Sequence, residues 1–90
     1  MEKDSYADLK EQLEKDFSWP SVYLFKFIIP ADNEKLAKTQ SLFGAEAEIS
    51  IKESSKGNYI SLSARELMLS ADEVIAKYKQ AGEIEGLMAL

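Results

Sequence analysis

The side chains best suited to chemistry in this 90-residue sequence lie in two segments that are expected to be neighbouring strands. Lys26 is the one charged residue of SVYLFKFII, and Arg65 ends the segment YISLSAR. That second segment also carries Tyr59, Ser61 and Ser63. Basic groups surrounded by hydroxyls hold carboxylates and other anions, so these five residues form a candidate interaction surface. Alternatively, both basic residues are solvated charges whose stems cover apolar surface.

A second polar cluster lies between two segments of alternating hydrophobicity and consists of Ser54, Ser55, Lys56, Gly57 and Asn58. Small residues, a lysine and a glycine could form a loop whose amides bind an anion. The cluster lacks the spacing of a phosphate-binding loop, however, and hairpin turns select the same residues for their backbone geometry. We therefore interpret it as a hairpin motif, with anion binding as the alternative.

The residue types that the chain lacks limit its chemistry more than those it contains. It has no cysteine, which excludes disulfides, thiolate nucleophiles and cysteine zinc sites. It has no histidine, the commonest general base and transition-metal ligand. The acidic residues fall at outward strand positions or helix starts, where solubility and helix dipoles account for them. We expect no catalytic residue, no metal and no cofactor, and hence no enzyme.

Composition and charge restrict the partners. A hydrophobic content of 46% with 30% charged residues is ordinary for a globular domain. The net charge of −5 disfavours nucleic acid and anionic membranes, so neither is an expected partner. The longest apolar run, residues 22–29, is too short to span a bilayer, and the N-terminal residues are charged throughout. These features predict a cytoplasmic location.

Hydrophobic periodicity predicts three helices and four strands. We expect helices at residues 5–17, 34–43 and 71–81, and strands at residues 21–29, 47–53, 59–65 and 84–90. Gly44 and Gly82 are expected to end the second and third helices. The first strand is apolar on both sides, and its charge-free face, which includes Phe25 and Phe27, should enter the core. The apolar tail of the chain is expected to form a buried last strand.

After the first helix, the element order is β-α-β-β-α-β. Right-handed crossovers then give a four-stranded antiparallel sheet of order 4-1-3-2, with two helices on one face. This is a ferredoxin-like α+β sandwich with an extra N-terminal helix. We predict one domain over residues 1–90, with the N-terminal helix in 1–18 and the βαββαβ core in 19–90.

The sheet face opposite the two helices poses a problem for a monomer. Its expected residues include Val22, Leu24 and Ile28 around Lys26, with Leu87 or Met88 added according to register. Few monomers expose so much contiguous apolar surface. We expect the N-terminal helix, a second copy of the chain or another protein to cover it. Trp19-Pro20 is either an interface anchor or packing between helix and sheet.

Several motifs resemble those of the YbeD-like family of small bacterial proteins, a domain-of-unknown-function family. They are Trp19-Pro20, Phe25-Lys26, residues 54–59 (SSKGNY) with Ser61 and Ser63, and the apolar end after Gly82. The resemblance covers nearly the whole chain. It implies a ferredoxin-like fold similar to the ACT regulatory domains of amino-acid metabolism, with no catalytic residues to carry over.

These observations together predict a non-enzymatic regulatory or protein-interaction module that resembles ACT-type domains. Its partner would be a protein, either a second copy or another chain. The alternative is a metabolite-sensing domain with a small-molecule site at a subunit interface. An enzyme that uses carboxylates or lysine is the third hypothesis.

Overall fold

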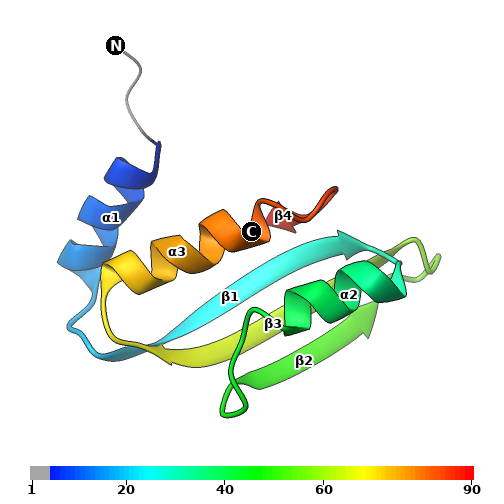
Figure 1. Ribbon diagram of the computed structural model, residues 1–90, viewed down its shortest axis with the longest axis horizontal. Helices are drawn as coiled ribbons and strands as arrows, with labels where there is room; N and C mark the ends of the chain where they lie inside the picture. Colours follow the sequence, from blue (N-terminus) through cyan, green and yellow to red (C-terminus); the bar gives the residue numbers. More distant parts are fainter. Residues whose placement is uncertain (1–4) are drawn as a thin grey trace.

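The computed structural model describes residues 5–90, so residues 1–4 of the predicted N-terminal segment 1–18 lie outside the described part (Figure 1). It is an α+β structure with a four-stranded antiparallel sheet and three helices. The elements in chain order are α1 (Ser5–Asp16), β1 (Ser21–Pro30), α2 (Asn33–Gln40), β2 (Glu48–Glu53), β3 (Tyr59–Met68), α3 (Ala71–Ala81) and β4 (Met88–Ala89).

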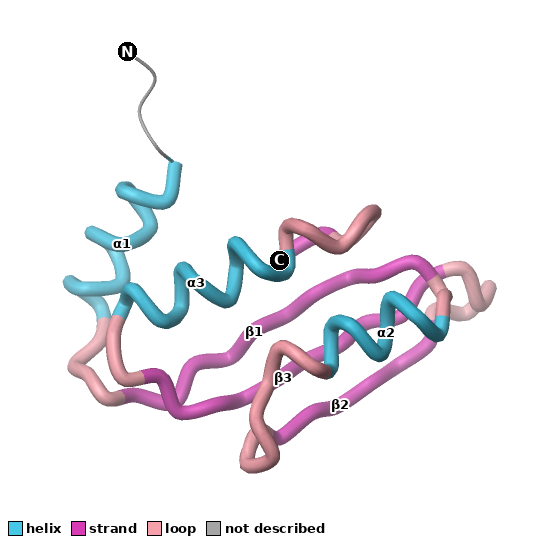
Figure 2. The backbone as a smooth tube through the Cα atoms, viewed as in Figure 1, coloured by secondary structure: helices cyan, strands magenta, loops and turns pink. Residues whose placement is uncertain are grey.

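The strand order is β2-β3-β1-β4, which is the predicted order read from the other edge. Every neighbouring pair is antiparallel, and β1 and β3 pair along their full lengths from Ser21↔Met68 to Pro30↔Tyr59. Helices α2 and α3 lie over one face of the sheet (Figures 1 and 2). The most hydrophobic strand, β1, is therefore central, as expected.

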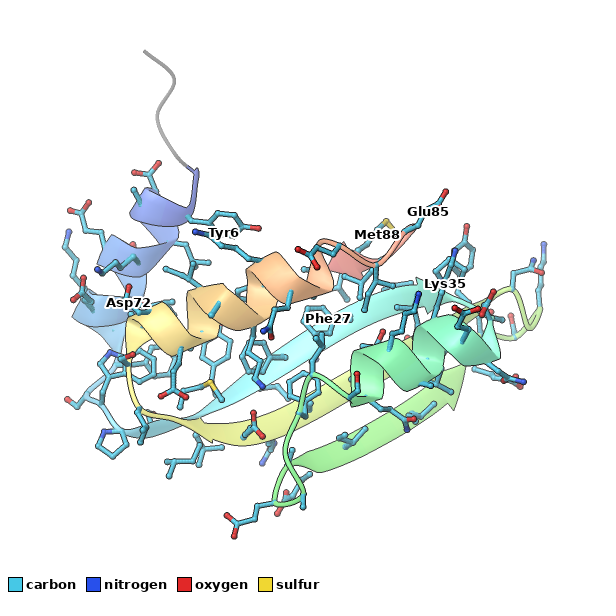
Figure 3. All side chains as sticks on the ribbon, in the orientation of Figure 1. Tyr6, Phe27, Lys35, Asp72, Glu85 and Met88 are labelled. Atoms are coloured by element: carbon cyan, nitrogen blue, oxygen red, sulfur yellow. The ribbon has the colours of Figure 1, made fainter. Side chains whose placement is uncertain are left out.

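Alternation along β1 and β3 builds the core between sheet and helices. Phe25, Phe27 and Ile29 from β1 are fully buried, as are Leu62 and Ala64 from β3. Figure 3 shows the Phe27 side chain in the space between α3 and α2. An edge-to-face ring contact strengthens this layer, since the Phe25 ring centroid lies 4.8 Å from that of Tyr23.

Helix α1 packs on the start of α3 and leaves the opposite sheet face open (Figure 1). Its Leu13 is 4% exposed and belongs to the core cluster. Lys10 Nζ lies 3.1 Å from Asp72 Oδ1 on α3, and this hydrogen bond and charge raise the pKa of Lys10 above its usual value. The N-terminal helix therefore does not cover the open sheet face, and Val22 on that face remains 60% exposed.

The second helix is shorter than predicted, and Gly44 does not end it. Helix α2 stops at Gln40, with Ser41 as C-cap in ordinary right-handed geometry. The chain leaves the helix early because Phe43 turns into the core, where its ring centroid lies 5.4 Å from that of Phe25. Gly44 instead donates its N–H to Glu66 Oε2 at 2.6 Å.

Two strands differ from their predicted lengths. β3 continues to Met68 rather than ending at Arg65. The prediction of a buried last strand over residues 84–90 is wrong, because β4 has two residues and both are exposed. The preceding residues form a turn at Gly86, whose φ is +84°. A Cβ at Gly86 would also lie 2.8 Å from Pro30 Cγ, so this turn requires glycine.

Candidate interaction surface

The open sheet face gathers the five candidate residues on one side. Register places Lys26 of β1 opposite Ser63 of β3, and Arg65 opposite Leu24. Tyr59 and Ser61 alternate with buried residues along the same strand, so they share this face. Ser63 is half-buried, and the other four candidates are exposed.

A hollow of about 430 Å³ lies at the centre of the open face. The lining residues come from three strands and are Leu24, Lys26, Glu48, Ser50, Ser63 and Arg65. The structure therefore brings Lys26, Ser63 and Arg65 together. Tyr59 and Ser61 lie further along β3, outside the hollow.

The two basic side chains of the hollow are unsatisfied by the rest of the described chain. Neither the Lys26 side chain nor the Arg65 side chain makes a hydrogen bond or ion pair with another residue in the range 5–90, although the strand register places Arg65 opposite Glu48. The lysine near the core behaves differently, because Lys77 Nζ lies 3.3 Å from Glu66 Oε1 and also donates to the Leu42 carbonyl. The hollow thus offers two cations to an incoming group.

Exposed apolar side chains flank the basic centre at both ends of the open face. At one end, Val22 and Leu67 are cross-strand partners and are 60% and 55% exposed. At the other end, Met88 pairs with Ile28 and is 54% exposed. Met88 rather than Leu87 therefore extends this face, since Leu87 packs against the core.

Sequence reasoning missed the ion pair between Glu66 and Lys77. It borders a groove of about 950 Å³ at the end of β3, beside the loop that begins at Gly44. Both side chains are mostly buried, and Lys77 Nζ also lies 5.2 Å from the Phe43 ring centroid. The sequence did indicate a buried partner for Glu66, because this glutamate occupies an inward strand position between Ala64 and Met68. Its contacts tie the α2–β2 loop to α3 and β3, which is a structural role.

The hairpin motif forms a tight exposed turn. Gly57 has φ +73° and donates its N–H to the Ser54 carbonyl at 2.9 Å. Ser54 Oγ accepts from the Tyr59 N–H at 3.1 Å. Turn geometry accounts for both residue types, and these two amides are already used within the turn.

Trp19 lies where α1 meets the sheet, partly buried and packed against the core cluster. Its ring stacks on Phe17 with centroids 5.4 Å apart. Its indole N–H is buried and has no acceptor among the residues described. These contacts favour the packing interpretation over that of an interface anchor.

One tyrosine has a perturbed pKa. Burial, followed by the hydrogen bond with Tyr23, raises the pKa of Tyr78 above its usual value. The two hydroxyl oxygens lie 3.0 Å apart. Tyr78 packs against the aromatic core and lines none of the described hollows, so this shift indicates a structural hydroxyl pair.

Residues 5–90 show neither a metal-type side-chain cluster nor a membrane-crossing helix. No cluster of three or more histidine, cysteine, aspartate or glutamate side chains in this range is arranged to hold a metal ion. None of the helices in the described range combines the length and apolarity needed to cross a membrane.

Comparison with family models, with curated proteins and with solved structures found no match to this chain. The resemblance to the YbeD-like family therefore rests on the sequence motifs alone.

Proposed function

We propose that this chain is a non-enzymatic interaction module whose open sheet face binds a segment of a partner protein. The segment would carry one or more carboxylates between apolar side chains. We further propose a ferredoxin-like βαββαβ arrangement and a cytoplasmic location. The observation that carries the proposal is the pair of basic side chains, Lys26 and Arg65, which make no ion pair and lie among mostly apolar and hydroxyl side chains of this face.

Charge distinguishes this face from the rest of the molecule. The charged residues at its strand positions are Lys26, Lys52 and Arg65, against the single acid Glu48. The whole chain carries a net charge of −5, so the excess of positive charge is local. A local basic patch recruits acidic partners and excludes basic ones, even where each exposed ion pair adds little affinity.

Apolar surface would supply most of the binding free energy. The exposed side chains Val22, Leu24 and Leu67 adjoin Arg65 through the strand register. Burial of apolar area contributes about 25 cal/mol per Å², whereas an exposed ion pair contributes about 0–1 kcal/mol. A partner segment would therefore gain affinity from the apolar ends and orientation from the basic centre.

The test is affinity purification of the intact protein from its native cell with charge variants. The variant Lys26→Glu/Arg65→Glu should lose a specific protein that the unchanged chain retains. The matched control is Lys15→Glu/Lys38→Glu, which changes the net charge equally at exposed helix positions. If both variants retain the same proteins, the open face is not the binding surface.

A metabolite-sensing role is the second candidate, because the hollow combines two cations with the hydroxyls of Ser50 and Ser63. Such a set suits a small carboxylate. A ligand at 100 times its dissociation constant adds about 2.7 kcal/mol of stability, which a thermal-shift screen of carboxylate metabolites would detect. A shift that Lys26→Glu/Arg65→Glu abolishes would favour sensing over protein binding. A screen without any shift would remove this candidate.

A further inference from the structure

Strand β2 (Glu48–Glu53) is an edge strand, and its outer edge is free. Within the described range it pairs with β3 alone, and Figure 2 shows it at the side of the sheet away from β4. Exposed edge strands are templates for pairing with another strand. The outer edge of β2 therefore leaves backbone groups available for pairing with another strand.

The backbone groups that face this edge can be identified. Ser54 N donates to the Tyr59 carbonyl at 2.9 Å, which continues the β2–β3 register by one pair. Backbone polar groups alternate in direction along an antiparallel strand. Ser50, like Ser54, therefore directs its N–H and C=O toward β3. Ile49 and Ile51 direct theirs toward the free edge.

The sequence of β2 is self-complementary about Ser50. In an antiparallel pair of two β2 strands with the two-fold axis at Ser50, Glu48 faces Lys52 of the second copy and Lys52 faces its Glu48. Ile49 faces Ile51 of the second copy, and these are the residues whose backbone groups point outward. Such opposed residues exchange both backbone hydrogen bonds. The backbone hydrogen bonds, the isoleucine pairs and the opposite charges are thus all matched in the register centred on Ser50.

The charged side chains at this edge make no ion pair within the described part of one copy, although the register places Glu48 opposite Arg65. Glu48 and Lys52 are exposed and make no ion pair with any other described residue. Ile51 is 43% exposed although it belongs to the core-facing side of the strand. Opposite charges and branched side chains facing each other across strands are stabilising pairs. A second copy would supply both.

Charge also selects the register. If the axis moves to Ile49 or Ile51, the charged residues of β2 on the open face no longer oppose each other within the strand. Stacking two open faces with the two-fold axis at the hollow would instead bring Lys26 and Arg65 toward their own copies, and like charges repel. The edge therefore suits a second copy of the chain, whereas the open face does not.

We propose that β2 pairs antiparallel with β2 of a second copy about Ser50, which joins two four-stranded sheets into one of eight strands. This inference does not depend on the proposed function, because it concerns the edge and not the open face. Its consequence is two basic open faces side by side. A dimer of this kind would bind a partner with two acidic segments more tightly than one copy could.

One strand pair buries less than the roughly 1,200 Å² typical of stable complexes, so the dimer should be weak. Sedimentation equilibrium of the purified chain from roughly 10 to 500 µM covers the expected range of association. The unchanged chain should show a concentration-dependent monomer–dimer equilibrium. A monomer at every concentration would overturn the proposal.

Charge variants locate the interface. Glu48→Lys alone and Lys52→Glu alone should each weaken self-association by about tenfold, because each places like charges opposite each other twice in a symmetric pair. Mixing the two single variants should restore dimerisation, since every lysine then faces a glutamate. The mixture also shows that both variants are folded. Lys56→Glu in the turn is the control and should change nothing.

Two outcomes contradict the register. Single variants that associate as strongly as the unchanged chain would place the interface elsewhere. Single variants that fail to associate even when mixed would show that Glu48 and Lys52 do not face each other. Both results are independent of the affinity purification that tests the open face.

Discussion

The two faces of the central strand β1 contrast within a single stretch of sequence. On the helix-covered face, Phe25 and Phe27 are fully buried among other aromatic rings. On the open face, the intervening Leu24 is 41% exposed, and the exposed Lys26 side chain makes no hydrogen bond or ion pair with another residue in the range 5–90. Neighbouring residues therefore belong to different environments.

This difference separates stability from recognition. On the buried face, the Tyr23 and Tyr78 hydroxyls pair with each other at 3.0 Å. The open face leaves charges and apolar side chains available to other molecules. Substitutions on the first face should change the free energy of unfolding, and those on the second should change binding.

The largest contrast is expected between adjacent residues of β1. Phe25→Ala should lower the free energy of unfolding by about 3–5 kcal/mol, because it leaves a cavity in the aromatic core. Leu24→Ala should cost less than about 1 kcal/mol, because the side chain is already partly solvated. Urea unfolding measures both. Equal costs would mean that the open face is covered in solution.

The second contrast is between two glutamates. Glu66→Ala removes the partner of Lys77 and an acceptor for the Gly44 N–H, so it should cost about 2 kcal/mol. Glu48→Ala on the open face should stay within about 0.5 kcal/mol. Thermal unfolding at neutral pH compares them. A negligible cost for Glu66→Ala would show that water replaces its contacts.

Alkaline pH should affect the buried face selectively. The raised pKa of Tyr78 favours its neutral form in the folded state, so its contribution is fully present below the unfolded value of about 10. That contribution is lost as pH rises above this value. Tyr78→Phe should flatten the decline of stability above about pH 10. Tyr59→Phe, at an exposed hydroxyl, is the control and should leave the curve unchanged.

A small effect on stability is expected at the centre of the open face. Lys26→Glu/Arg65→Glu should change the free energy of unfolding by no more than about 1 kcal/mol, since neither side chain has an internal hydrogen bond or ion pair to lose and Arg65→Glu places a second acid opposite Glu48. Chemical denaturation provides the measurement. A large loss of stability would indicate a structural role and weaken any binding experiment with this variant.

Local patterns made much of the fold predictable. Alternation in β1 and β3 identified their buried faces. Residues 70–73 read Ser-Ala-Asp-Glu, which is the pattern of a capping box, and Ser70 Oγ does cap α3 by accepting the Glu73 N–H at 3.2 Å. In a capping box the glutamate side chain accepts from the backbone N–H of the capping serine. Here Glu73 Oε2 accepts instead from the N–H of the preceding residue, Leu69. The strand order followed from right-handed crossovers.

What could not be predicted depends on contacts between distant residues. The early end of α2 is set by Phe43 entering the core, and the turn at Gly86 is set by its close approach to Pro30. The placement of α1 depends on whether its narrow apolar stripe fits α3 or the sheet better, which local periodicity does not encode. The open face could be predicted by residue, but its hollow required the register of three strands.

Site-specific photo-cross-linking in the native cell tests the open face most directly. A photoreactive residue in place of Ser61, which is exposed on that face, should form a covalent adduct with another protein chain. The same residue in place of Ala76, exposed on α3, should form none. Adducts from Ala76 but not from Ser61 would contradict the account and place the working surface on the helical side.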